Sequence, residues 1–275
     1  MNYGLYPAPQ HLRGLVRYFW NFEYTAGDPL PPVHQAMADG CPEIIFQYNG
    51  GFIENKNFKS YLRAPRSDSK VLTLDEHMGL FAIRLYPHAI RQLLGIPNSE
   101  LVNGSFELTH IFGNKYSYVN EQMLEASTME QRIKVASDFL SALWQASPKD
   151  PIFECIRLML QNEGNVDLDE LRALTGLSVK QFERRFKSVA GFPPKYYSRI
   201  TRFQGTKRKY ASGKFKTLSE LSHACDYYDQ SHFIREFKEF SGMQANHFFK
   251  IVSDETDESK ILRNLVLAKD KPDFA

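Results

Sequence analysis

The sequence predicts an α+β protein of two parts, a β-rich sandwich or barrel followed by an all-α C-terminal half. Short runs of β-branched and aromatic residues, separated by Gly, Pro and Asn, fill roughly the first 110 residues. Apolar residues then recur at helical spacing. A chain of 275 residues with 43% hydrophobic residues is long enough for one large domain or two ordinary ones.

Charge is distributed unevenly along this chain. The totals of 34 Lys and Arg and 32 Asp and Glu nearly cancel, but residues 151–250 carry 17 basic and 11 acidic side chains. Twelve basic residues and one acid, Glu183, lie between Lys180 and Lys216. This asymmetry predicts a module that meets a polyanion, and acidic ends that limit non-specific binding.

The β-rich part contains four clear strand patterns, followed by a short helix at His88–Leu94 that Gly95 ends. The strand patterns lie at Leu15–Tyr24, Glu43–Tyr48, Val71–Leu74 and Leu80–Leu85.

A pair of helices is expected over Tyr118–Ala146, and the second begins at a capping box formed by Thr128 and Gln131. Two interpretations of this pair remain open: packing against the β-rich domain, or a dimer contact. The dimer contact would use the apolar residues Ile133, Phe139, Leu140, Leu143 and Trp144.

Ser147–Pro151 breaks the helical pattern and predicts a domain boundary. The expected division is a β-rich domain over 1–117, a helical linker over 118–150, a helical domain over 151–252 and a charged tail over 253–275. Seven helices are expected in the helical domain, at 152–162, 167–174, 178–189, 194–211, 217–224, 229–240 and 244–251. A further helix is expected in the tail at 259–267.

Residues 167–192 have the pattern of a helix-turn-helix motif. Gly176 suits the turn, Ser178 suits an N-cap, and Phe182 and Phe186 give the second helix an inward face. Its outward face carries Lys180, Gln181, Arg184 and Lys187, whose donors suit the major groove of DNA.

A second copy of this pattern follows about fifty residues later. Asp226 occupies the turn, Asp229 suits an N-cap, and Phe233 and Phe237 face inward. Two such units joined by the basic helix 194–211 could reach successive major grooves, roughly 34 Å apart.

The chain resembles the AraC family of bacterial transcription regulators in two stretches, LRALTGLSVKQFERRFKSVAGFPPKYY and YYDQSHFIREFKEFSG. The resemblance covers residues 150–250. It implies that Lys180, Glu183 and Arg184 of one helix, and Gln230, Ser231 and Arg235 of the other, face DNA bases. Contacts with DNA phosphates are expected from Ser178, Gln181, Lys187, Lys195, Arg199, His232 and Lys238. For Glu183, orienting a neighbouring cation is an open alternative, and Lys207-Arg208-Lys209 is expected to be a solvated helix face.

Two departures from the family pattern stand out. Asp226 replaces the usual Gly of the second turn, and Gln244-Ala245 replaces a Thr-Pro pair. Because Asp tolerates the left-handed conformation better than most residues, we expect the turn to survive.

The stretches HQAMADGCPEIIFQY and LFAIRLYPHAIRQLLGIPNSEL resemble the N-terminal domain of one branch of AraC-type regulators. This resemblance implies a sensing or dimerising, cupin-like β-domain. A ligand pocket lined by Trp20, Phe46, Tyr48 and Tyr86 is one interpretation of its aromatic residues, and core packing is the other.

We expect no catalytic residues, metal site, cofactor, signal peptide or membrane segment, because none of the corresponding motifs is present. Three widely spaced cysteines are expected to be free thiols in a cytoplasmic protein. The sequence therefore predicts a regulator of transcription that binds double-stranded DNA, with RNA polymerase, a small-molecule effector and a second copy of itself as further expected partners. The alternative is an enzyme or small-molecule-binding protein whose helical half is a scaffold.

Overall fold

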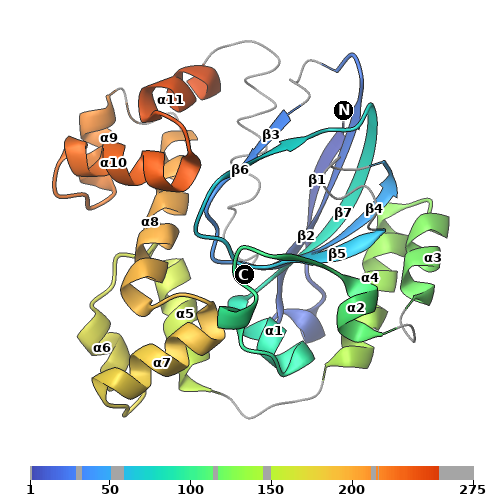
Figure 1. Ribbon diagram of the computed structural model, residues 1–275, viewed down its shortest axis with the longest axis horizontal. Helices are drawn as coiled ribbons and strands as arrows, with labels where there is room; N and C mark the ends of the chain where they lie inside the picture. Colours follow the sequence, from blue (N-terminus) through green and yellow to red (C-terminus); the bar gives the residue numbers. More distant parts are fainter. Residues whose placement is uncertain are drawn as a thin grey trace.

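The computed structural model describes residues 2–28, 33–50, 59–113, 117–144, 150–211, 215 and 217–253. It has a β-rich N-terminal part and a helical C-terminal part, as the sequence predicts (Figure 1). The tail helix expected at 259–267 lies outside the described residues. Within the described residues, no helix is both long and apolar enough to cross a membrane.

The main sheet has six antiparallel strands in the order β1-β2-β7-β4-β5-β8, and β3 and β6 form a second, two-stranded sheet. The strand bounds are β1 Asn2–Pro7, β2 Val16–Thr25, β3 Val33–Ala36, β4 Glu43–Asn49, β5 Ser60–Arg63, β6 Lys70–Thr73, β7 His77–Leu85 and β8 Ser105–Glu107. The strand patterns found in the sequence correspond to β2, β4, β6 and β7.

Side chains on alternate positions of the main sheet fill two different cores. Phe19, Phe46 and Phe81 belong to a core that lies under the helices. Trp20 and Ile45 point the other way, into a core shared with the small β3–β6 sheet. This follows from the two-residue period of a β-strand, in which neighbouring side chains face opposite sides.

Four helices follow or flank the main sheet. Their bounds are α1 Pro87–Leu94, α2 Leu108–Phe112, α3 Tyr118–Glu125 and α4 Met129–Leu143. The capping box predicted at Thr128 and Gln131 begins α4. Phe139 and Leu140 of α4 are buried against the sheet, with Phe139 edge-on to Phe46 at 6.5 Å between ring centroids. Packing against the β-rich domain therefore accounts for these two residues, which are not available for a dimer contact.

The C-terminal part contains seven helices among its described residues, each within two residues of its predicted bounds at either end. They are α5 Pro151–Gln161, α6 Leu168–Ala173, α7 Val179–Ala190, α8 Pro194–Ala211, α9 Leu218–Ala224, α10 Gln230–Ser241 and α11 Ala245–Ser253. Figure 1 shows α8 running between α5–α7 below and α9–α11 above. Its 18 residues span about 27 Å. Cys41, Cys155 and Cys225 are all buried and unpaired.

Candidate nucleic-acid interface

Helices α6 and α7 form the first helix-turn-helix unit. Gly176 adopts φ +65° in the turn, which a glycine does at little cost. The Gln181 side-chain oxygen accepts a hydrogen bond from the Ser178 backbone N–H at 3.1 Å, which fixes the start of α7. Phe182 and Phe186 are buried in the helical core, as predicted. Their burial leaves the opposite face of α7 to solvent.

Helices α9 and α10 form the second unit in the same way. Asp226 adopts φ +55°, so the turn survives without glycine. The Asp229 carboxylate accepts a hydrogen bond from the His232 backbone N–H at 2.6 Å and caps α10. Phe233 and Phe237 are fully buried.

The two N-caps, Ser178 and Asp229, place the two units in a common register. Phe182 then corresponds to Phe233, Arg184 to Arg235 and Lys187 to Lys238. The two turns have the same length, but the left-handed residue lies one position earlier before the N-cap in the second, and Tyr228 of this turn is 89% exposed. The repeated motif therefore presents an arginine and a lysine at equivalent positions of two helices.

All six residues predicted to read bases are exposed. Within the described part of the chain, none of them has a hydrogen bond or ion pair to another side chain. They are Lys180, Glu183, Arg184, Gln230, Ser231 and Arg235. Of the predicted phosphate contacts, Ser178, Gln181, Lys187, Lys195 and Lys238 are also exposed, whereas Arg199 and His232 are partly buried.

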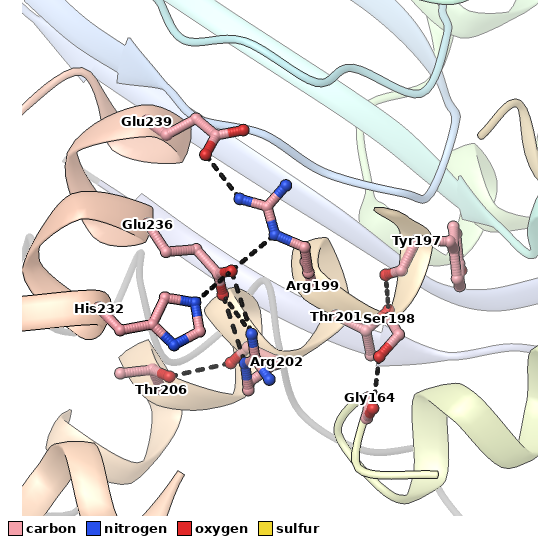
Figure 2. A network of polar contacts seen from close by, with 10 residues as sticks. All are labelled: Gly164, Tyr197, Ser198, Arg199, Thr201, Arg202, Thr206, His232, Glu236 and Glu239. Atoms are coloured by element: carbon pink, nitrogen blue, oxygen red, sulfur yellow. Dashed lines mark hydrogen bonds and ion pairs between the residues drawn. The ribbon is translucent and has the colours of Figure 1, made fainter. Parts of the chain in front are cut away.

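Arg199 and His232 surround a buried carboxylate, Glu236, that is 1% exposed (Figure 2). Arg199 Nε donates to Glu236 Oε2 at 2.7 Å, and Arg199 Nη2 donates to Glu239 Oε2 at 2.6 Å. Arg202 Nη2 donates to Glu236 Oε1 at 2.9 Å. The network joins α8 to α10, so these arginines already have partners within the protein.

Sequence reasoning missed Glu236, although a signal for it was present. It lies between Phe233, Phe237 and Phe240 on the inward face of α10, where a charged residue requires a buried partner.

The expectation that Lys207-Arg208-Lys209 is a solvated face is wrong. Lys207 is buried, with its ammonium 5.3 Å from the centre of the Phe203 ring. Arg208 and Lys209 are paired with Glu163 at 2.8 and 3.1 Å. Burial would raise the pKa of Glu163, but hydrogen bonds and charge from these two cations outweigh it and lower the pKa. The basic stretch is thus partly neutralised by acids from elsewhere in the chain.

The predicted pocket of Trp20, Phe46, Tyr48 and Tyr86 is also wrong as a single site. Trp20 and Phe46 lie in the cores on opposite faces of the sheet. Tyr86 stacks on His88 with the ring centroids 5.3 Å apart, beyond the end of β7. Trp20 instead uses its indole N–H to donate to Glu43 Oε1 at 3.1 Å. Strand alternation separates Trp20 from Phe46 and Tyr48, which share one core.

Comparison with known proteins agrees with this geometry. Residues 171–251 match a family described as "Helix-turn-helix domain", and residues 5–107 match one described as "Domain of unknown function (DUF6597)". No curated protein matches the chain significantly in sequence.

Solved structures of ToxT from Vibrio cholerae resemble the chain in structure. ToxT of strain O395 has 10% identity and a TM-score of 0.46, with 86% of this chain and 98% of ToxT covered. A ToxT structure with a bound unsaturated fatty acid has 12% identity and a TM-score of 0.46, with 84% and 94% covered.

The alternative of an enzyme with a helical scaffold does not explain the exposed residues of α7 and α10, whereas a helix-turn-helix domain does. Both units lie within the matched range, except that α6 begins three residues before it. The chain is therefore a DNA-binding transcription regulator with an AraC-type helix-turn-helix domain at its C-terminus and a DUF6597 domain at its N-terminus.

Proposed function

We propose that α7 and α10 enter two successive major grooves of double-stranded DNA and read bases directly. The supporting observation is that Arg184 and Arg235 occupy equivalent positions in the two units and are exposed without a protein partner among the described residues. A guanidinium can donate two hydrogen bonds to the O6 and N7 atoms of guanine, the commonest specific contact in this groove. Lys180, Glu183, Gln230 and Ser231 complete the two reading surfaces.

Phosphate contacts set the register of the protein on the duplex. Ser178, Gln181, Lys187, Lys195 and Lys238 are exposed and suited to this role. Arg199 and His232 contribute less in this proposal, because Glu236 and Glu239 hold Arg199 and Glu236 lies 3.7 Å from the His232 imidazole.

The two arginines can be tested by selecting duplexes from a random pool with the full-length protein. Each of Arg184→Ala and Arg235→Ala should cost about 1–3 kcal/mol on the selected duplex and relax sequence preference at one base position. The matched controls are Lys187→Ala and Lys238→Ala. They should weaken binding to all sequences alike and reduce the salt slope by about 1 each. Arginine variants that weaken all sequences equally would rule out base reading.

The N-terminal domain modulates DNA binding or contact with RNA polymerase in this proposal, and the chain has no catalytic role. A small-molecule effector, a homodimer and a cytoplasmic location remain predictions.

A further inference from the structure

The N-terminal domain touches both reading helices at their C-terminal ends. The last carbonyl groups of any α-helix lack partners within the helix and need donors from elsewhere. In both α7 and α10, the glycine after the helix supplies one such donor. Gly191 N bonds Lys187 O, and Gly242 N bonds Lys238 O, each at 2.9 Å.

The first contact is made by Asn98, which is completely buried. Its amide nitrogen donates to Val189 O in the last turn of α7 at 2.6 Å and to Pro87 O of the N-terminal domain at 2.6 Å. Beside it, Arg91 Nη1 donates to Ser188 Oγ at 2.9 Å. One side chain thus joins α1 of the N-terminal domain to the first reading helix.

The second contact lies at the end of α10. Ala38 N donates to Phe240 O at 2.9 Å, and Gln35 Nε2 donates to Ser241 O at 3.0 Å. Gln204 of α8 returns a hydrogen bond from its amide to Ala38 O. In the common register of the two units, Phe240 corresponds to Val189. The N-terminal domain therefore donates a hydrogen bond to the equivalent backbone carbonyl of each unit.

The close fit extends to the two equivalent glycines. A Cβ atom on Gly191 would lie 2.8 Å from Val102 Cγ1, and one on Gly242 would lie 2.2 Å from Ser69 Oγ. Both neighbours belong to the N-terminal domain. The backbone at the C-terminal ends of α7 and α10 therefore packs closely against the N-terminal domain.

The part of the N-terminal domain that carries Ala38 is itself held firmly. The Asp39 carboxylate accepts a hydrogen bond from Cys41 N at 2.9 Å and pairs with the buried Arg84 at 2.6 Å. A Cβ on Gly40 would lie 2.4 Å from Tyr197 Cε2 of α8, so this loop also fits tightly against the helical domain.

We propose that the N-terminal domain is a two-point clamp that fixes the separation of the two reading helices, with Asn98 and Gln35 as positioning residues. This proposal rests on the proposed reading of two grooves. The clamp makes the full chain selective for the spacing between two DNA half-sites, one read by α7 and the other by α10. Loss of either contact frees one unit to pivot about α8. The protein then tolerates altered spacing while keeping its base preferences within each half-site.

The test measures the Kd of full-length proteins on duplexes derived from the selected sequence. One base pair is inserted or removed between the two half-sites. The variants are Gln35→Glu and Asn98→Ala. Gln35→Glu is nearly isosteric and places a carboxylate against Ser241 O at the negative end of α10. The control is Gln122→Glu on the exposed face of α3.

For each protein we compare the Kd on the duplex of altered spacing with the Kd on the parent duplex. We expect this ratio to be about 2–10-fold lower in both variants than in wild type, because one net hydrogen bond changes an equilibrium constant by about that factor. The control should keep the wild-type ratio. An unchanged ratio in Gln35→Glu overturns the proposal. So does equally tighter binding to every duplex, which would show that docking inhibits binding instead. If Asn98→Ala does not fold, Gln35→Glu decides alone.

A second measurement needs no DNA and separates this proposal from the proposed function. Ala173→Cys on α6 and Ser219→Cys on α9 place spin labels on two exposed sites, while the three native cysteines are buried. The distance distribution between the labels should widen when Gln35→Glu is added. A distribution that stays narrow rules out the clamp, whereas a wider one with no DNA binding contradicts only the groove-reading role.

Discussion

Gly176 and Asp226 show, at the scale of one residue, how two chemically different residues serve the same turn. Both adopt the left-handed conformation between the helices of a helix-turn-helix unit, at φ +65° and +55°. The resemblance to the AraC family marked Asp226 as a departure, and the tolerance of Asp for this conformation predicted correctly that the turn would persist. The Asp226 carboxylate also accepts a hydrogen bond from Asn165 Nδ2 at 2.8 Å, which a glycine would lack.

Substitutions at these two turns should change stability in opposite directions. A Cβ at Gly176 has no atom of the structure within 4 Å, so Gly176→Ala should cost only the backbone strain, about 1–2 kcal/mol. Asp226→Gly relieves that strain but loses an exposed hydrogen bond, so it should stabilise the protein by about 0.5 kcal/mol. Urea unfolding measures both free energies. Equal destabilisation by the two substitutions would contradict this account.

At the scale of helices and strands, local signals in the sequence explain what could be predicted. The bounds of the C-terminal helices followed from helical periodicity and from the N-caps expected at Ser178 and Asp229. The structure adds N-caps at Asp150, Asp167 and Thr217 and a glycine after α7 and α10. Strands β1, β3, β5 and β8 were missed. They are three to six residues long, and β1 contains Gly4 and Pro7, so they depend on pairing with distant strands rather than on local pattern.

The acidic partners of the basic residues could not be predicted from local sequence patterns either, because they lie far away along the chain. Glu236 lies 37 positions from Arg199, and Glu163 lies 45 from Arg208. Helical periodicity indicates which positions face outward, and the resemblance to the AraC family selected the six base-reading candidates among them. Which cations are neutralised depends on tertiary packing.

His88 provides a test at the junction of α1 and α5. Its ring stacks on Phe153 of α5 with the centroids 4.4 Å apart, and Nε2 lies 2.8 Å from Gly14 O. Burial lowers the pKa of the imidazole below 6.5, and the contact with Gly14 and the charge of Asp150 offset this only in part. Between the lowered pKa and about pH 6.5 the unfolded chain binds a proton that the folded chain does not, so stability falls as pH falls.

The measurement compares wild type with His88→Phe, which keeps an aromatic ring but cannot titrate. The wild-type free energy of unfolding should fall relative to that of the variant as pH is lowered from 7.5 to 5.5. Other histidines titrate equally in both proteins and cancel in the difference. A difference that is independent of pH would show that His88 is not held neutral by the fold.

At the scale of the whole molecule, the structure changes the meaning of the basic stretch between Lys180 and Lys216. Five of its cations are paired with acids of the same chain: Arg185, Arg199, Arg202, Arg208 and Lys209. Lys207 is buried, and Lys214 and Lys216 lie outside the described residues. Lys180, Arg184, Lys187 and Lys195 remain exposed, and α10 adds Arg235 and Lys238.

The number of cations that can displace counterions sets the salt dependence of DNA binding. Six exposed cations predict a slope of log K against log salt of about −5, whereas all twelve of the basic stretch would give about −11. Titrating full-length protein onto its selected duplex at several salt concentrations measures this slope. Glu163→Gln would leave Arg208 and Lys209 less neutralised and should steepen it. A wild-type slope near −10 would mean that the internal ion pairs open on binding, and that the fold does not hold these cations away from DNA.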